Sequence, residues 1–379
     1  MKVLMVTNSY PDLPGSYRGI FIRKLCLALQ QKGIGVQVLT PKVFSNSPFH
    51  EVDSGIKVNR FWYPSHNRPL NQFTRIPAFA MTIFLLTGFI KAVFLAIREK
   101  PDVIHGNWIV PTGLIAALAG RLTGIPVVNS ARGMDVRIRN NRLVRTLFDI
   151  ALKASTILTV VSSAMKSVKG LEKAEIISSG IDEVFFEIPI EKKPPRIIYT
   201  RSLEPVYDPQ TFIRSIPLVV KHRPDARFIM AGTGSLAEDL KTLAEELGIA
   251  DNVSFPGRIS TREVADLMKD AMIFVSAAIE DGTSIALLEA MAAGVTPVAT
   301  DIEANRAWVN HGIDGYLFMP KNSNDLANKI IQAISGEISP SVFQEKRAIL
   351  RDKIAWEIIA LKFIDIYANV TVKSGNMAG

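Results

Sequence analysis

Residues 280–294 read Glu280-Asp-Gly-Thr-Ser-Ile-Ala-Leu-Leu-Glu-Ala-Met-Ala-Ala-Gly294 and follow the apolar run MIFVSAA. The apolar run predicts a buried strand, and the apolar spacing within 280–294 predicts a helix. Thr283 or Ser284 is placed to cap the start of this helix, and Gly294 is placed to end it. The loop amides and the positive end of the helix then come together, which is an arrangement that binds anions.

Two acidic residues lie on either side of the predicted cap. Glu289 is about 7–8 Å along the helix axis from Ser284. Its carboxylate therefore does not reach a phosphate at the helix tip, but it can accept hydrogen bonds from the hydroxyls of a ribose lying alongside. Asp281 precedes the cap, where it is placed for sugar hydroxyls on the other side of the phosphates. The stretch favours a site for a sugar nucleotide.

The rest of the chain alternates short apolar runs with longer helical patterns, as in VLMV, FIRKLCLALQQKG and VQVLT. This β-α-β rhythm predicts parallel sheets, and it restarts with RIIYT after the polar stretch EIPIEKKPPR. Since 379 residues exceed what one hydrophobic core usually supports, we expect two doubly wound α/β domains. The expected ranges are 1–186 for the first domain, 187–195 for a linker, 196–353 for the second domain and 354–379 for a C-terminal helix.

Further motifs occur in a recognisable order along the chain. They are SYRGIFIRKL with Gly19, DVIHGNWIVPTGLIAALAGRLTGIPVV, Arg201 after IIYT, MAGTGS with Gly232 and Gly234, FPGRIS with Arg258, TDIEANRAW and HGIDGYLF. Together with 280–294 they resemble, nearly end to end, the family 4 glycosyltransferases of the GT-B fold. The signature of that family is two acidic residues separated by seven others. The resemblance implies two Rossmann-like domains facing each other across a cleft, with the last helix crossing back to the first domain.

The resemblance also implies roles for single residues. Arg201 is expected to contact the diphosphate of the donor, Glu289 its ribose and Asp281 the transferred sugar. An enzyme without a metal must stabilise the leaving diphosphate with fixed cations and amides, and the planar fork of an arginine suits a diphosphate. Other residues expected to line the donor site are Gly282, Thr283, Ser284, Gly19, Gly234, Arg258 and Tyr207.

Three positions depart from the commoner family pattern. Tyr207 stands where the diphosphate arginine is usually followed, six residues on, by a lysine. A His-Gly-x-x-Asp loop is usual where this chain has Arg132-Gly-Met-Asp135. Arg132 is a candidate catalytic cation that replaces the missing lysine, or it pairs with Asp135. Asp281 replaces the more usual Glu, so neighbouring Glu280 is an alternative sugar contact.

Cysteine and histidine are scarce. Cys26 is the only cysteine, and no metal-ligand spacing appears among it and the five histidines, so we expect no metal and no cofactor beyond the sugar nucleotide as co-substrate. His105 and Asn107 follow a strand end, where a structural hydrogen-bonded histidine is commoner than a catalytic one. A reducing, cytoplasmic setting fits this composition. The N-terminal MKVLMVTNSYP predicts a buried strand over Lys2 to Val6 and no secretory signal.

Positive charge is concentrated in the first half. Residues 1–185 contain 23 Lys and Arg against 11 Asp and Glu, whereas the remainder contains 21 against 25. This asymmetry suggests an anionic partner, and no nucleic-acid-binding motif accompanies it. The stretch RIRNNRLVRTLFDIALK sets Arg139, Arg142 and Arg145 among apolar residues, which is typical of a helix on anionic lipid but also of a solvated domain helix.

An apolar segment begins at Ile76 and carries no charge up to Ile90. It is interrupted too soon to favour a membrane span, so a buried or membrane-surface helix is expected. We therefore expect a peripheral protein at the cytoplasmic face of the cell membrane, without nucleic acid among its partners.

The resemblance implies a retaining glycosyltransferase, and the scarcity of metal-ligand residues favours one that is independent of metal. It would transfer a sugar from a nucleotide-diphosphate sugar to a glycan or lipid-linked acceptor, in the synthesis of a surface polysaccharide or glycolipid. Two alternatives stay open: a nucleotide-sugar epimerase of related fold, which needs no acceptor, and a catalytically silent homologue that acts as a binding partner.

Overall fold

The computed structural model describes residues 1–13, 15–73, 78–137, 141–191, 194–336 and 338–377. They form two compact units, each built on its own β-sheet. The first unit comprises Met1–Gly180 and the residues from Trp356 onward, and the second comprises Ile181–Ala355. Two α/β domains with parallel sheets, as predicted, are therefore confirmed.

The boundary between the units differs from the expected one after residue 186. The chain enters the second unit at Ile181, because helix α6 (Glu183–Phe186) packs against helices of that unit. Phe185 and Phe186 are both buried there. The described residues of the expected linker, 187–191 and 194–195, also belong to the second unit.

The first unit has an eight-stranded sheet in the order β3-β4-β2-β1-β5-β6-β7-β8. Neighbouring strands run parallel, except for the antiparallel pair β3 and β4. The strands are β1 (Lys2–Val6), β2 (Gly35–Lys42), β3 (His50–Asp53), β4 (Ile56–Trp62), β5 (Val103–Asn107), β6 (Val127–Ala131), β7 (Ile157–Val160) and β8 (Glu175–Ile176). The helices are α1 (Ile20–Gln31), α2 (Ala78–Glu99), α3 (Leu114–Thr123), α4 (Met134–Arg137), α5 (Arg142–Lys153) and α14 (Trp356–Met377).

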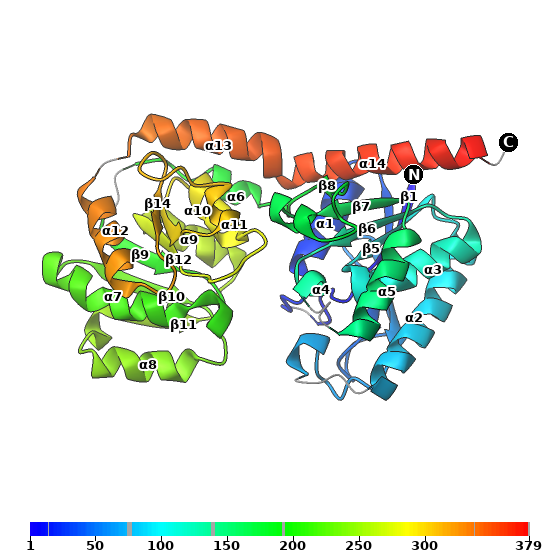
Figure 1. Ribbon diagram of the computed structural model, residues 1–379, viewed down its shortest axis with the longest axis horizontal. Coiled ribbons are helices and arrows are strands. Elements are labelled where there is room, and N and C mark those ends of the chain that lie inside the picture. Colours follow the sequence, from blue (N-terminus) through cyan, green and yellow to red (C-terminus); the bar gives the residue numbers. More distant parts are fainter. Residues whose placement is uncertain (14, 74–77, 138–140, 192–193, 337, 378–379) are drawn as a thin grey trace. The chain divides into compact units, whose positions relative to one another are not determined.

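Side-chain alternation along β1 explains the layers of this unit. Val3 and Met5 point to one face, into the core formed with α1 and α14, whereas Leu4 and Val6 point to the other, into the core formed with α2 and α3. Successive side chains of a strand point to opposite faces, so a strand that is apolar throughout predicts helices on both faces. The strand expected from Lys2 to Val6 is confirmed (Figure 1).

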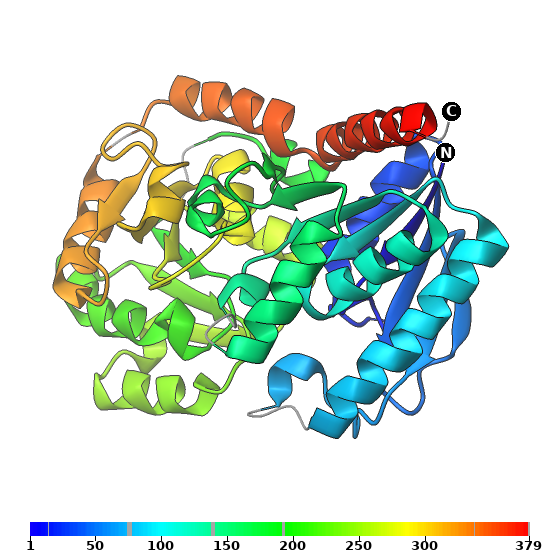
Figure 2. The same cartoon turned by 45° about the vertical axis from the view of Figure 1, so that its right-hand side comes forward.

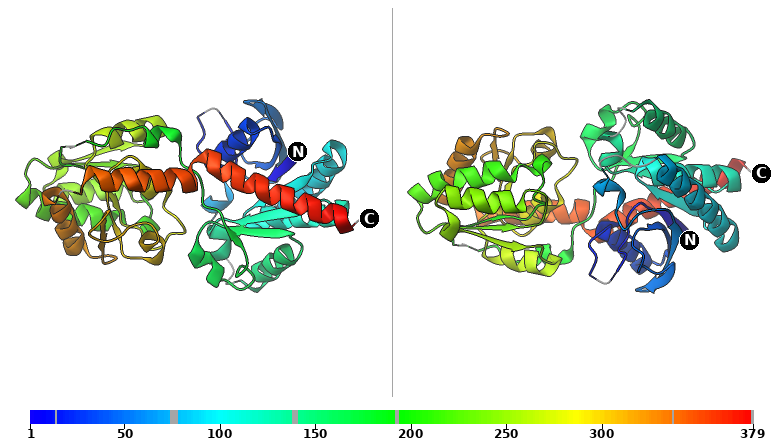
Figure 3. Two further views of the ribbon diagram at one scale, coloured as in Figure 1. Left: turned by 90° about the horizontal axis from the view of Figure 1, so that it is seen from above. Right: turned by 90° about the horizontal axis from the view of Figure 1, so that it is seen from below.

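The last helix, α14, completes the first unit. It begins at Trp356 and packs beside α1 (Figure 3). Its Phe363 and Tyr367 side chains are buried. The chain leaves and re-enters this unit at one place, since a Cβ atom on Gly180 would lie 2.4 Å from the Trp356 ring. Only glycine permits that approach.

The second unit has a six-stranded, wholly parallel sheet in the order β11-β10-β9-β12-β13-β14. In chain order this is the Rossmann arrangement, in which the strand order reverses between the first strand, β9, and the fourth, β12. The strands are β9 (Arg196–Tyr199), β10 (Arg227–Ala231), β11 (Val253–Gly257), β12 (Ile273–Ser276), β13 (Thr296–Thr300) and β14 (Tyr316–Phe318). The helices are α6, α7 (Pro209–His222), α8 (Ala237–Glu246), α9 (Thr261–Asp270), α10 (Ile285–Ala292), α11 (Glu303–Arg306), α12 (Ser323–Ser335) and α13 (Pro340–Ile354).

Candidate functional site

The reversal of strand order brings two loops of the second unit together. Strands β9 and β12 are parallel neighbours, with Ile197 opposite Ile273. Their carboxyl ends therefore lie at the same sheet edge, where Arg201 follows β9 and the loop 277–284 follows β12. Ligands of open α/β sheets bind at this kind of position.

Arg201 is bound to the loop that precedes α10. Its Nη1 atom donates to Asp281 Oδ2 at 2.5 Å, to Ser284 Oγ at 2.6 Å and to Ser276 Oγ at 3.4 Å. The side chains of Arg201 and Asp281 are only 10% and 12% exposed. The sequence predicted that both residues lie in the donor site, and the structure adds that they form an ion pair with each other.

Ser284 is the N-cap residue of α10, and Gly294 follows the helix with a φ of +68°. The Ser284 hydroxyl accepts from the Leu287 amide at 3.2 Å as well as from Arg201. A guanidinium at a helix N-terminus opposes the helix dipole, whereas an anion there is favoured. In this structure the Asp281 carboxylate supplies the negative charge beside the N-terminus of α10.

Charge and burial act in opposite directions on Arg201. Burial is the largest influence and lowers the pKa of its guanidinium, but the Asp281 carboxylate together with the Tyr207 and Tyr199 hydroxyls outweighs it, and the net pKa is raised. The group therefore carries a fixed positive charge at neutral pH, in a place largely shielded from water.

Tyr207 packs on the same guanidinium. The Arg201 Cζ atom lies 4.3 Å from the centroid of the Tyr207 ring, which is a cation–π contact. The short helix η5 (Pro205–Tyr207) that carries it is held by the Tyr199 hydroxyl, which donates to the Tyr207 carbonyl at 3.1 Å. Tyr207, which stands where the family usually has a lysine, therefore supports the Arg201 cation and adds no second cation.

Two glycines of MAGTGS bring a third loop against the Arg201 loop. A Cβ atom on Gly232 would lie 2.2 Å from the Arg201 carbonyl oxygen, and one on Gly234 would lie 2.3 Å from that of Leu203. The Leu203 amide donates to the Thr233 carbonyl at 3.0 Å. Gly234, predicted as a donor-site residue, therefore has an evident packing role in positioning the Arg201 loop.

The other expected donor-site residues of this unit lie around the same edge. Glu289 is half-buried on α10, and Thr283 donates its hydroxyl to the Gly282 carbonyl at 2.8 Å. Arg258 is exposed just after β11, and Glu280, the alternative sugar contact, is exposed at the loop start. A cavity lined by Met272, Gly294 and Phe343 among others lies by the amino ends of β12 and β13, so it is separate from this edge.

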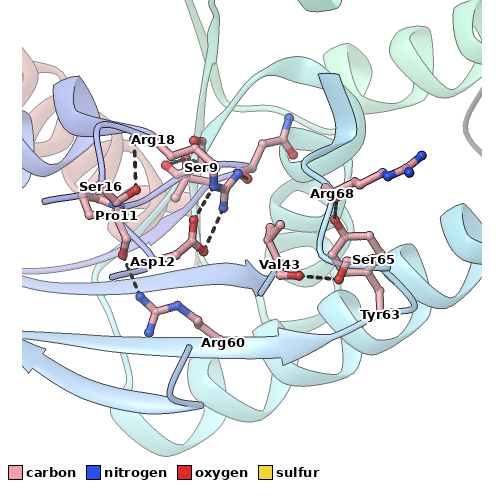
Figure 4. Close-up of polar contacts among 12 residues, drawn as sticks. Ser9, Pro11, Asp12, Ser16, Arg18, Val43, Arg60, Tyr63, Ser65 and Arg68 are labelled. Atoms are coloured by element: carbon pink, nitrogen blue, oxygen red, sulfur yellow. Dashed lines mark hydrogen bonds and ion pairs between the residues drawn. The ribbon is translucent and has the colours of Figure 1, made fainter. Parts of the chain in front are cut away.

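In the first unit, Gly19 marks a tight loop before α1. Its φ is +68°, and a Cβ atom there would lie 2.1 Å from the Ser9 carbonyl oxygen. The adjacent Arg18 donates from Nε to Asp12 Oδ2 at 2.5 Å, and Arg60 donates to the Pro11 carbonyl at 2.7 Å (Figure 4). The glycine thus permits a close turn that two arginines hold in place.

Arg132, the candidate catalytic residue of the first unit, bonds to Asn107. Its Nη2 and Nε atoms both donate to Asn107 Oδ1, at 2.6 and 3.1 Å. The Asp135 carboxylate instead accepts backbone amides of Ile109, Arg132 and Gly133. The Arg132 guanidinium therefore bonds to the side-chain oxygen of Asn107. The alternative expected from the sequence was a pair with Asp135. Burial lowers the pKa of Arg132 to about 10, which leaves it charged at neutral pH.

His105 is fully buried in a hydrogen-bond chain that the sequence did not reveal. Its Nδ1 atom lies 2.6 Å from the Tyr367 hydroxyl of α14, and Nε2 lies 2.7 Å from Ser130 Oγ, which is 2.6 Å from Thr159 Oγ1. Burial holds the pKa of His105 well below its usual value. The structural interpretation of this histidine is supported, and its partner on α14 lies 262 residues away, beyond any local sequence signal.

Within the described ranges, no group of three or more His, Cys, Asp or Glu side chains is placed to hold a metal ion.

Arg142 and Arg145 of the expected basic surface are exposed on α5, and Arg139 lies outside the described residues. Asn141 caps this helix by accepting the Leu143 amide at 2.8 Å.

Sequence comparison agrees with the two-unit arrangement. Residues 19–167 match the family described as glycosyl transferase 4-like domain, and residues 180–350 match glycosyl transferases group 1. The chain is 24% identical to N-acetyl-alpha-D-glucosaminyl L-malate synthase of Bacillus anthracis, over 98% of each protein. It is 27% identical to alpha-monoglucosyldiacylglycerol synthase of Streptococcus pneumoniae, over 88% of this chain and 78% of that protein.

Solved structures share the fold. The crystal structure of Anabaena Alr3699/HepE in complex with UDP superposes with a TM-score of 0.76 at 17% identity, covering 97% of this chain and 100% of that one. At this identity the likeness concerns the fold, which is GT-B.

Proposed function

Because the chain belongs to the family 4 glycosyltransferases, we propose that it transfers a sugar from a nucleotide-diphosphate sugar to an acceptor, without a metal ion and with retention of the anomeric configuration. The observation that carries this proposal is the cation at the N-terminus of α10. Arg201, Ser284 and the first amides of α10 converge at the sheet edge where β9 and β12 end.

The chemistry follows from charge. As the bond between sugar and diphosphate breaks, negative charge grows on the leaving diphosphate, and preorganised donors in a dry site stabilise it most strongly. Arg201 offers a planar fork that matches two phosphate oxygens, and Tyr207 holds that fork in place. In the free protein Asp281 neutralises Arg201, so we propose that the donor diphosphate displaces Asp281, which then accepts from hydroxyls of the transferred sugar.

The remaining site residues have supporting roles in this proposal. Glu289 would accept from the ribose hydroxyls, and Gly282, Thr283 and Ser284 would contact the phosphates. Gly19, Gly234 and Arg258 are proposed at the edges of the donor site. Arg132 is proposed as a second cation that acts on the leaving group, since it is held rigidly by Asn107 and remains charged.

We propose a glycan or lipid-linked acceptor, bound mainly by the first unit, at the cytoplasmic face of a membrane. Exposed basic residues of α5, among them Arg142 and Arg145, support an anionic surface as partner. A relative named for a glucosyldiacylglycerol product supports a lipid acceptor, and the UDP complex of a protein with the same fold makes UDP-sugars the first donors to test.

The proposal is tested in two steps. Thermal unfolding with UDP, GDP, ADP and dTDP and their sugars should show a raised midpoint for the bound nucleotide, since a ligand of the folded state stabilises it. Release of nucleoside diphosphate from that donor should then require an acceptor, supplied as a lipid extract or oligosaccharide mixture. Interconversion of the donor sugar without acceptor would indicate an epimerase, and nucleotide binding without any turnover would indicate a silent homologue.

A further inference from the structure

Helix α2 presents an apolar stripe to solvent. Its exposed large apolar residues are Phe79, Leu86, Ile90, Phe94 and Ile97, with exposed fractions between 48% and 71%. At about 100° per residue these five positions fall within a sector of about 80°. They extend for about 27 Å along the helix axis, from a rise of about 1.5 Å per residue. Exposed apolar residues in a continuous line of this length mark an interaction surface.

The opposite side of α2 is fixed in the domain. Phe84, Ala92, Leu95 and Ala96 are buried in the core under β1 and β4. A Cβ atom on Gly88 would lie 2.6 Å from the Cδ1 atom of Ile115 in α3, so the two helices are in close contact. By length and composition alone α2 is long enough to cross a membrane, with 33% of its most apolar window buried. A helix held against a sheet along one side can lie on a bilayer but cannot span it.

The neighbouring helices continue the surface. Helix α3 packs against both α2 and α5, and the three lie side by side on one face of the sheet (Figure 2). The two neighbours add Leu118, Leu122, Leu143 and Ile150 to the exposed apolar residues. These helices thus carry 9 of the 19 large apolar residues that are exposed in the described parts of the chain, which is a concentration and not an even scatter.

Positive charge accompanies this apolar surface. Lys91 Nζ lies 5.3 Å and Arg98 Cζ lies 5.9 Å from the centroid of the Phe94 ring, so both cations border the stripe. Helices α2, α3 and α5 together contain six Lys and Arg against two Asp and Glu. Apolar residues that insert, bordered by cations that meet phosphate headgroups, are the features of a helix at a membrane interface.

We propose that the α2–α3–α5 face docks the protein on an anionic bilayer, with the α2 stripe buried at the boundary of headgroups and acyl chains. This inference rests on the membrane association in the proposed function and adds α2, beside the charges of α5, as the element that inserts. A lipid surface fits better than a second copy of this chain. In a two-fold dimer the face would meet itself, and its cations would face cations.

The test is sedimentation of the purified full chain with phosphatidylcholine vesicles that contain or lack phosphatidylglycerol. The wild type should bind the anionic vesicles. The triple variant Leu86→Gln, Ile90→Gln, Ile97→Gln should bind them at least about a hundredfold more weakly, because three inserting side chains are lost. Lys91→Gln with Arg98→Gln should weaken binding about thirtyfold at low salt, since each cation near an anionic surface contributes about 1 kcal/mol.

A matched control places the same change on the second unit. Ile313, Met319 and Ile349 are also exposed, and their triple change to Gln should leave vesicle binding unaltered. Each variant is also titrated by calorimetry with the nucleotide, among UDP, GDP, ADP and dTDP, that raises the unfolding midpoint of the wild type. This titration reports on folding and on the donor site. A wild type that binds nucleotide but no vesicles overturns this inference and leaves glycosyl transfer standing.

Two further results overturn it. One is unchanged vesicle binding by the folded α2 triple variant. The other is a wild-type dimer in light scattering that the α2 changes convert to a monomer, which would assign the face to a second copy of the chain.

Discussion

The guanidinium of Arg201 lies over the ring of Tyr207, with Cζ 4.3 Å from the ring centroid. The ring face replaces the cation usual at this position, so Tyr207 orients the one arginine that also bonds to Asp281 and Ser284. We predict that Tyr207→Leu lowers kcat by about 2- to 30-fold, from a cation–π contribution of about 0.5–2 kcal/mol. Tyr207→Phe keeps the ring face and should retain near-normal kcat. Equal losses in the two variants would assign the effect to the hydroxyl instead.

Glu289 allows a direct test of donor binding. The proposed ribose contact predicts that Glu289→Ala raises the Kd of the nucleotide by about tenfold, because one or two hydrogen bonds to a charged acceptor are lost. Calorimetry measures this, with thermal unfolding as the check on folding. Glu245→Ala, at an exposed residue of α8, is the matched control and should leave the Kd unchanged. An unaltered Kd in folded Glu289→Ala would restrict this carboxylate to a structural role.

Arg132 and Tyr207 are linked in a rescue experiment. If Arg132 stabilises the leaving group, Arg132→Ala should lower kcat by about a hundredfold. Adding Tyr207→Lys should then restore part of the loss, because it supplies the cation that the family usually has. Steady-state kinetics of the two single variants and the double variant decide the matter. A double variant no faster than Arg132→Ala would leave Arg132 with only its structural bond to Asn107.

The buried His105 predicts a pH dependence of stability. Its pKa in the folded state lies well below the usual value, so the folded protein keeps it neutral while the unfolded chain protonates it below about pH 6.5. Unfolding then takes up a proton, and stability falls by up to about 1.4 kcal/mol per pH unit as the pH drops below that value. The dependence fades as the pH rises above about 6.5, because the histidine of the unfolded chain then also becomes neutral.

Chemical denaturation between pH 5 and pH 7 measures this effect. His105→Gln should show a correspondingly shallower decline in the stability of the first unit than the wild type. His222→Gln, at an exposed residue in the last turn of α7, is the control and should follow the wild type. Parallel declines in the wild type and in His105→Gln would show that other groups govern acid stability.

Local sequence patterns predicted those parts of the fold that local forces determine. The apolar strand from Lys2 to Val6 and the cap and end of α10 at Ser284 and Gly294 follow from alternation, capping and glycine geometry. The boundary near residue 186 was placed too late, since the burial of Phe185 and Phe186 depends on tertiary contacts with α9 and α10.

The side-chain pairings within the site could not be predicted from the sequence, because they join residues that are distant along the chain. Asp281 follows Arg201 by 80 residues, and their ion pair results from the pairing of β9 with β12. The bond between Arg132 and Asn107 depends likewise on parallel neighbours, β5 and β6. Motif order identified these residues as a set, but only the sheet register reveals which of them touch.

Arg201 provides the most direct test of the central claim, which is sugar transfer with a fixed cation on the leaving diphosphate. The measurement is acceptor-dependent release of nucleoside diphosphate by the wild type and by Arg201→Ala, each in the presence of EDTA. We predict full wild-type activity in EDTA and a fall in kcat of about 10²–10³ in Arg201→Ala, with a smaller change in donor Kd. Wild-type activity that EDTA abolishes and Mg²⁺ or Mn²⁺ restores, or full activity in Arg201→Ala, would contradict the account.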